Sequence, residues 1–158
     1  MSTLRQLREI SSDRSNLIEI ELTETALSGD NGDIISKLHS LKNLDLKVAI
    51  DDFGTGYSSL AYLKNFPIDI LKIDQAFIRD LAENQKDKAI VTSIIQLGKS
   101  LGFKTVAEGV EEKEHVEILS ALGCDYAQGY WFAHPIPEHM LAETIRAIEL
   151  HAQDHCLH

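Results

Sequence analysis

The sequence predicts an α/β protein built on a parallel sheet. Short apolar segments with the character of strands alternate with longer segments whose apolar residues recur with helical spacing. No strand is followed directly by another through a tight turn, so each connection holds a helix, as parallel pairing requires. With 158 residues, of which 44% are hydrophobic, the chain is long enough to bury the core of one domain.

Five strands and five helices are expected in alternation. The strands are predicted over residues 18–22, 47–52, 70–74, 105–108 and 130–132. The helices are predicted over residues 33–44, 58–66, 86–101, 112–122 and from Pro137 to about Leu150. Gly102 and Gly123 stand where left-handed C-caps are favoured, and Pro137 suits the first position of a helix. Residues 151–158 are expected to form a flexible tail.

Charge and composition exclude several classes of function. Lys and Arg number 15 against 25 Asp and Glu, a net charge of -10, which disfavours a broad surface for DNA, RNA or acidic membranes. A small anionic ligand remains compatible with this charge if the site holds a metal ion. No segment approaches the roughly 18 apolar residues of a membrane helix, and residues 1–10 lack the apolar part of a signal peptide. Two cysteines are too few for a disulfide framework, so a cytoplasmic protein is expected.

Carboxylates follow most of the predicted strands. The residues at or just beyond strand ends include Glu21, Asp51, Asp52, Lys72, Asp74 and Glu108. Loops after the strands form the functional face of parallel α/β folds. Singly, each residue has a structural alternative: exposure to solvent for Glu21, capping for the aspartates, or an extended surface-reaching side chain for Lys72.

Together, these carboxylates favour a site for hard cations. Carboxylates that converge on one edge repel one another unless a cation is bound, and oxygen ligands suit divalent metals. Adjacent aspartates suit two metals in particular, since one carboxylate can bridge ions roughly 3.5–4 Å apart. The loop that contains Gly54 and Gly56 follows the paired aspartates directly, so it can move against the site.

Five motifs in order resemble those of the EAL-domain family, bacterial phosphodiesterases with TIM-barrel-like folds that hydrolyse cyclic di-GMP to pGpG. They are Glu21-Leu-Thr-Glu24, Asp51-Asp-Phe-Gly-Thr-Gly-Tyr-Ser-Ser-Leu60, Leu71-Lys-Ile-Asp74, Ala107-Glu-Gly-Val-Glu111 and Gln128-Gly-Tyr130. The motifs fall within residues 17–137. The resemblance implies one domain over residues 1–158, folded as part of a TIM-like barrel with about five parallel strands and flanking helices.

The resemblance also implies roles for particular residues. Metal ligands are implied at Glu21, Asp51, Asp52 and Glu108, with Asp51 as the bridge between two Mg²⁺ or Mn²⁺ ions. Lys72 matches the catalytic lysine beside the nucleophilic water, and Glu108 is an alternative general base.

Three further positions match the family. Glu24 corresponds to the glutamate that stabilises the loop after the aspartates, and Glu111 and Gln128 correspond to further site or substrate positions. His134 stands where the family often has an arginine, a departure expected to affect the metals little.

The larger departure concerns motifs that this sequence lacks. The Glu-Ala-Leu motif of the family, the arginine that follows it and an asparagine ligand on a later strand do not occur in the 158 residues. Eight strands of a TIM barrel take about 250 residues, so this length accommodates about five. The expectation is therefore the C-terminal part of a barrel with an incomplete two-metal site.

Three alternatives follow for function. The chain is a fragment of a cyclic di-GMP phosphodiesterase, inactive or weakly active alone; or a non-catalytic EAL-like module that binds cyclic di-GMP or a protein partner; or a gene remnant. The first is favoured, because a binding module has no need to keep Asp51, Asp52, Lys72 and Glu108 together.

An open sheet also leads us to expect a partner. Five strands cannot close into a barrel, so residues assigned to the interior are expected to be partly uncovered. They are Ile20, Val48, Ile50, Leu71, Ile73 and Val106. Self-association, or pairing with a missing N-terminal half, is therefore expected in addition to binding of cyclic di-GMP.

Overall fold

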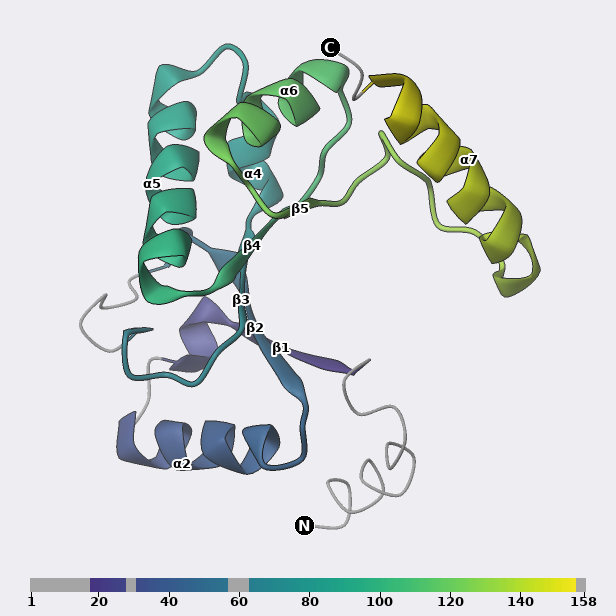
Figure 1. Ribbon diagram of the computed structural model, residues 1–158. Coiled ribbons are helices and arrows are strands. Elements are labelled where there is room, and N and C mark those ends of the chain that lie inside the picture. Colours follow the sequence, from purple (N-terminus) through teal and green to yellow (C-terminus); the bar gives the residue numbers. More distant parts are fainter. Residues whose placement is uncertain (1–17, 28–30, 57–62, 156–158) are drawn as a thin grey trace.

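The computed structural model describes residues 18–27, 31–56 and 63–155. In these residues five parallel strands form a sheet in the order β1-β2-β3-β4-β5 (Figure 1). The strands are β1 (Glu19–Thr23), β2 (Lys47–Phe53), β3 (Ile70–Ile73), β4 (Lys104–Ala107) and β5 (Tyr126–Ala127). The prediction of an α/β fold with about five parallel strands is confirmed.

Described helices follow β1, β3, β4 and β5. They are η2 (Glu24–Leu27) and α2 (Asn31–Lys42) after β1, α4 (Gln75–Ile78) and α5 (Gln85–Leu101) after β3, α6 (Lys113–Leu122) after β4, and η3 (Glu138–Met140) and α7 (Leu141–His155) after β5. In Figure 1, α2 and α5 lie on the left of the strands, whereas α7 stands apart on the right. Among the described helices, none combines the length and apolar character needed to cross a membrane.

The main core lies between the central strands and this helix layer. Val48 and Ile50 of β2 and Leu71 and Ile73 of β3 are each 0% exposed and belong to one apolar cluster. A Cβ built on Gly98 of α5 would lie 4.0 Å from Leu71 Cδ1, so this set of side chains faces the helices.

The expectation that these four residues would be partly uncovered is therefore wrong. Strands of βα units are apolar on both faces, so an apolar residue does not reveal which face it occupies. Ile20 and Val106, from the same expected set, are half-buried.

At two places in the fold, an aspartate just before one strand accepts a hydrogen bond from the backbone of the adjacent strand. Asp69 Oδ2 accepts a hydrogen bond from the backbone N–H of Val48 over 2.8 Å, and Lys42 Nζ lies 2.7 Å from the same carboxylate. Asp125 Oδ2 likewise accepts from the Thr105 N–H over 3.0 Å. Each aspartate satisfies a backbone donor at the amino end of a strand, opposite the functional edge.

Most predicted elements agree with the structure, and β5 does not. The predicted strand over residues 130–132 is a turn, and the strand is Tyr126–Ala127. The α6 helix ends at Gly123, where φ is 75°, and the chain enters the sheet almost at once. The Trp131 N–H donates a hydrogen bond to the Val110 carbonyl rather than to a neighbouring strand. This contact between loops overrides the β-propensity of residues 130–132.

Other differences concern helices. Pro137 precedes η3 rather than opening a helix, and α7 continues through His155. The backbone is therefore helical in most of the predicted tail, whose flexibility stays a prediction. Most of the helix predicted over residues 58–66 lies outside the described part of the chain. The short α4 helix, capped by the Asp74 side chain, was not predicted.

Candidate functional site

A bulge in β2 places two aspartates opposite one lysine. Ile50 pairs with Leu71 and Phe53 pairs with Ile73, so Asp51 and Asp52 together lie opposite Lys72. Asp52 has φ of 54°, an uncommon conformation for a residue other than glycine. Adjacent strand residues normally point to opposite faces, and a bulge with one left-handed residue allows both carboxylates to serve one site.

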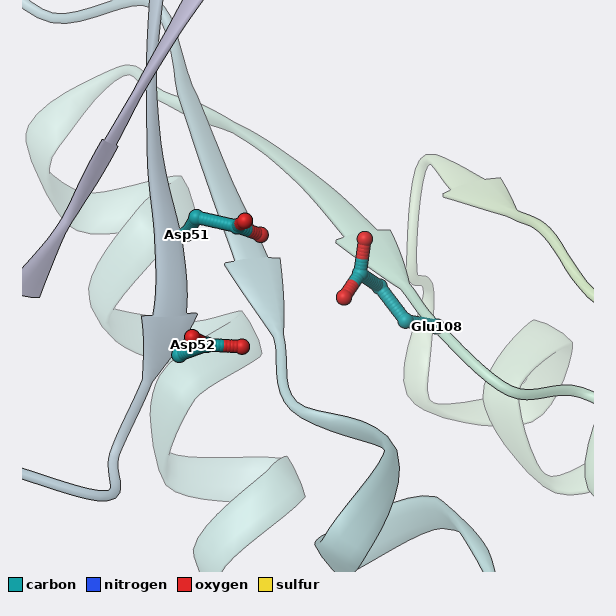
Figure 2. A group of neighbouring side chains, drawn as sticks. All are labelled: Asp51, Asp52 and Glu108. Atoms are coloured by element: carbon teal, nitrogen blue, oxygen red, sulfur yellow. The ribbon is translucent and has the colours of Figure 1, made fainter.

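These aspartates meet Glu108, the residue that follows β4. One carboxylate oxygen from each of Asp51, Asp52 and Glu108 lies within 4.8 Å of the others. Figure 2 shows the Asp51 and Asp52 side chains pointing from β2 toward the side of Glu108, whose carboxylate points back. We call these three residues the acidic group. The structure thus brings together three of the four predicted metal ligands.

Lys72 of β3 lies among carboxylates from β1, from β2 and from the end of β4. Its Nζ is 2.7 Å from Glu21 Oε1, 2.9 Å from Asp51 Oδ1 and 2.8 Å from Glu108 Oε1. The fourth predicted ligand, Glu21 of β1, therefore joins the site through Lys72. Burial lowers the pKa of Lys72, but the contacts with Glu108, Glu21 and Asp51 raise it more, so its pKa lies above the ordinary value. Lys72 is a buried cation at neutral pH.

Asp74, one of the carboxylates expected at the strand ends, lies beside the acidic group, although it was not among the four predicted metal ligands. Its hydrogen bond with Asp52 raises the pKa of Asp52, and burial and the negative charge of Asp51 act in the same direction. Asp74 Oδ1 also accepts a hydrogen bond from the Ala76 N–H over 2.7 Å. The cap of α4 thus fixes Asp74 beside Asp52. In the sequence, Asp74 is the last residue of the motif Leu71-Lys-Ile-Asp74.

The loop after the aspartates is fixed by Glu24. This side chain is buried, and its Oε2 accepts hydrogen bonds from the backbone N–H groups of Gly54 and Gly56, both over 3.0 Å. Glu24 opens η2 directly after β1. The chain immediately after β1 therefore holds the chain immediately after β2.

The loops after β4 and β5 are joined beside Glu108. Gln128 Nε2 donates a hydrogen bond to Glu108 Oε1 over 2.9 Å, and the Val110 N–H donates to the Gln128 carbonyl over 3.0 Å. Glu111 behaves differently: in the described part of the chain its side chain is exposed and makes no hydrogen bond or ion pair. The structure therefore brings Gln128 to the acidic group and places Glu111 in solvent.

The residues present fit a divalent cation. Carboxylate oxygens are the ligands that Mg²⁺ and Mn²⁺ prefer, and three of them converge here. The buried Asp51 Oδ1 faces the Lys72 ammonium over 2.9 Å. A carboxylate oxygen that faces one ammonium keeps a further lone pair with which it can bind a metal.

Comparison with known proteins identifies the family. The sequence model of the EAL domain matches residues 1–135. The chain belongs to the EAL domain family. Among its relatives, the cyclic di-GMP phosphodiesterase NbdA of Pseudomonas aeruginosa is 43% identical over 135 residues, which are 85% of this chain and 17% of NbdA. The chain thus spans about a sixth of the length of this curated relative.

Solved EAL structures match the described fold. The structure "PaMucR Phosphodiesterase, c-di-GMP complex" superposes with a TM-score of 0.83 at 40% identity, over 89% of this chain and 57% of that one. The manganese and cyclic di-GMP complex of Klebsiella pneumoniae BlrP1 superposes with a TM-score of 0.76 at 34% identity, over 85% of this chain and 35% of that one. The sheet described above is therefore the EAL, TIM-barrel-like architecture, as the sequence motifs predicted.

Proposed function

We propose that this chain supplies the acidic half of the catalytic centre of a cyclic di-GMP phosphodiesterase. The reaction is hydrolysis of one phosphodiester bond: a water oxygen forms a bond to phosphorus, the bond from phosphorus to the ribose 3′ oxygen breaks, and that oxygen takes up a proton. The product is linear pGpG. The main support for this proposal is the β2 bulge, which directs Asp51 and Asp52 to one side beside Glu108.

The proposal assigns metal binding to the carboxylates. Asp51, Asp52 and Glu108 would hold two Mg²⁺ or Mn²⁺ ions together with Glu21, and Asp51 would serve both ions. When bound, the cations activate water and neutralise charge that develops on the phosphate. Support comes from membership of the EAL domain family and from the manganese in the BlrP1 complex.

Other residues orient this centre. Lys72, 2.8 Å from Glu108 Oε1, carries the positive charge that would hold the attacking water and the phosphate near the carboxylates. Gln128 fixes the Glu108 carboxylate, and Glu24 fixes the loop after Asp52. Glu111, exposed beyond β4, is proposed to contact substrate rather than metal.

Activity of the 158-residue polypeptide by itself is expected to be no more than a trace. Its sequence lacks the Glu-Ala-Leu motif and the asparagine ligand. Loss of a residue that only supports a metal ligand typically lowers metal affinity or activity about 10–100-fold, and loss of a ligand itself should lower them more. Supplying the N-terminal part of a related EAL barrel in trans is expected to raise hydrolysis.

The test is chromatographic detection of pGpG from cyclic di-GMP in Mn²⁺, with and without the added N-terminal part. Asp51→Asn should abolish the restored activity, whereas Asp80→Asn, which alters an exposed aspartate outside the site, should leave it unchanged. Assembly of the two parts without any pGpG would contradict the enzyme and favour a binding module. Rapid hydrolysis by the polypeptide alone would contradict the need for the absent motifs.

A further inference from the structure

Lys72 has an unusual position for a lysine. Its side chain is 8% exposed, and its Nζ lies within 2.9 Å of carboxylates from three segments of the sheet: Glu21, Asp51 and Glu108. The ion pairs that the described structure gives to these three carboxylates all involve Lys72. One ammonium thus faces three carboxylates, leaving a net negative charge at the end of the strands.

The same carboxylates can serve two purposes. Asp51 Oδ1 and Glu108 Oε1, which contact Lys72 Nζ, belong to two residues of the acidic group. A divalent cation bound to that group would lie close to the ammonium, and like charges repel strongly where side chains are buried. Without Lys72, the carboxylates would repel one another in the folded chain.

We propose that Lys72 is a built-in counter-ion of these carboxylates, which stabilises the folded sheet and competes with a divalent cation for the same carboxylates. This inference rests on the proposed function only in taking the acidic group as the metal site. It assigns opposite signs to the two effects of the lysine: the charge strengthens folding and weakens metal binding. A lysine that merely shapes the site would strengthen both.

Lys72→Met tests these signs, because methionine keeps an unbranched apolar side chain and removes the charge. In EDTA, the melting temperature of K72M should fall by several degrees. Calorimetric titration should show Mn²⁺ binding at least about tenfold tighter than in the unaltered protein. Lys104→Met is the matched control, since Lys104 also pairs with an aspartate, Asp125, but is 60% exposed. K104M should leave Mn²⁺ affinity unchanged.

Two outcomes would overturn the proposal. One is a folded K72M protein that binds Mn²⁺ with equal or weaker affinity, and the other is an unchanged melting temperature in EDTA. If neither protein bound Mn²⁺, both the metal site of the proposed function and the competition proposed here would be contradicted. The melting temperature in EDTA would still decide whether Lys72 acts as a counter-ion.

A measurement on the unaltered protein covers the case in which K72M does not fold. With ¹⁵N-labelled lysine, the Nζ signal of Lys72 in EDTA should show slow hydrogen exchange, as expected for an ammonium held by carboxylates. Addition of Mg²⁺ should shift this signal and leave that of Lys104 in place. Saturable Mg²⁺ binding without change at Lys72 would contradict the competition.

Discussion

Glu24 Oε2 accepts a hydrogen bond from the Gly56 backbone N–H over 3.0 Å. The approach is close enough that a Cβ on Gly56 would lie 2.9 Å from the Glu24 carboxyl carbon. A second hydrogen bond, from Gly54, ends on the same oxygen. One buried carboxylate thus sets the path of the chain that leaves the paired aspartates.

Glu24→Ala should destabilise the protein, because two backbone N–H groups lose their acceptor. Loss of a buried hydrogen-bond partner costs about 1–3 kcal/mol, measured as the free energy of unfolding in urea. Glu24→Gln keeps one acceptor oxygen and should cost less. Glu83→Ala, at an exposed glutamate, is the control and should stay within about 0.5 kcal/mol of the unaltered protein. Equal stability of E24A and E83A would contradict the role of Glu24.

Gly129→Ala should be strongly destabilising. A Cβ at Gly129 would lie 2.2 Å from the Val110 carbonyl oxygen and 2.3 Å from its nitrogen, so the loops after β4 and β5 would have to separate. Gln128, which holds Glu108, would move with them. Urea unfolding should show a greater loss than for Gly102→Ala.

Gly102 is a matched control because it has a positive φ of 78°, but no atom lies within 4 Å of the position that a Cβ would take there. G102A therefore isolates the backbone cost, about 1–2 kcal/mol. If G129A were no less stable than G102A, the close approach to Val110 would not hold these loops together.

The sequence predicted β1 to β4, which carry or precede the predicted metal ligands and Lys72, but it misplaced β5. Residues 130–132, Tyr-Trp-Phe, have high β-propensity, yet Trp131 bonds to Val110 of a neighbouring loop. Propensity is local, whereas this contact joins segments about twenty residues apart. Tyr126 and Ala127, which form β5, carry no pattern long enough to predict a strand.

The candidate site was predictable in composition but not in geometry. Paired aspartates after a strand suggested a shared site, yet regular alternation would send Asp51 and Asp52 to opposite faces. Only the register of β2 against β3 shows the bulge that brings them together. Asp74 was expected at the same edge of the sheet, but its contact with Asp52 was not predicted, because that contact depends on the same bulge and on the α4 cap.

Asp125→Ala should lower stability in a pH-dependent way. Burial raises the pKa of Asp125, but hydrogen bonds from Lys104 and Thr105 lower it more, so the folded-state pKa lies below 3.8. A depressed carboxyl pKa stabilises the folded state above the unfolded-state value, and that stabilisation is lost as pH falls through the folded-state pKa. At pH 7 the variant should lose about 1–3 kcal/mol, since the buried Thr105 N–H loses its acceptor.

The measurement for Asp125 is urea unfolding at pH 7 and at steps below pH 4. The difference between D125A and the unaltered protein should narrow through the acid range. Asp80→Ala, at an exposed aspartate, should show no such trend. A difference that stays constant down to acid pH would show that the Asp125 charge contributes nothing to folding.

Self-association is the last prediction. Among the described strands, β1 and β5 each pair on one side only, and unpaired strand edges favour pairing with another chain. Large apolar side chains are also exposed on and near α7: Met140 is 43%, Leu141 49% and Ile145 45% exposed. Sedimentation at micromolar concentration should therefore show species larger than the 17.6 kDa monomer.

Charge on the apolar face of α7 should separate the two sources of association. If α7 contributes to association, Leu141→Glu should reduce the sedimenting mass. Ala147→Glu, on a different face of α7 from Leu141, should not. Association that persists in both variants would point to the edges of β1 and β5. Because Val48, Ile50, Leu71 and Ile73 are covered by the helices, the sheet face they occupy cannot drive association. A monomer with a cooperative melt at these concentrations would contradict the prediction and show that the strand edges are protected.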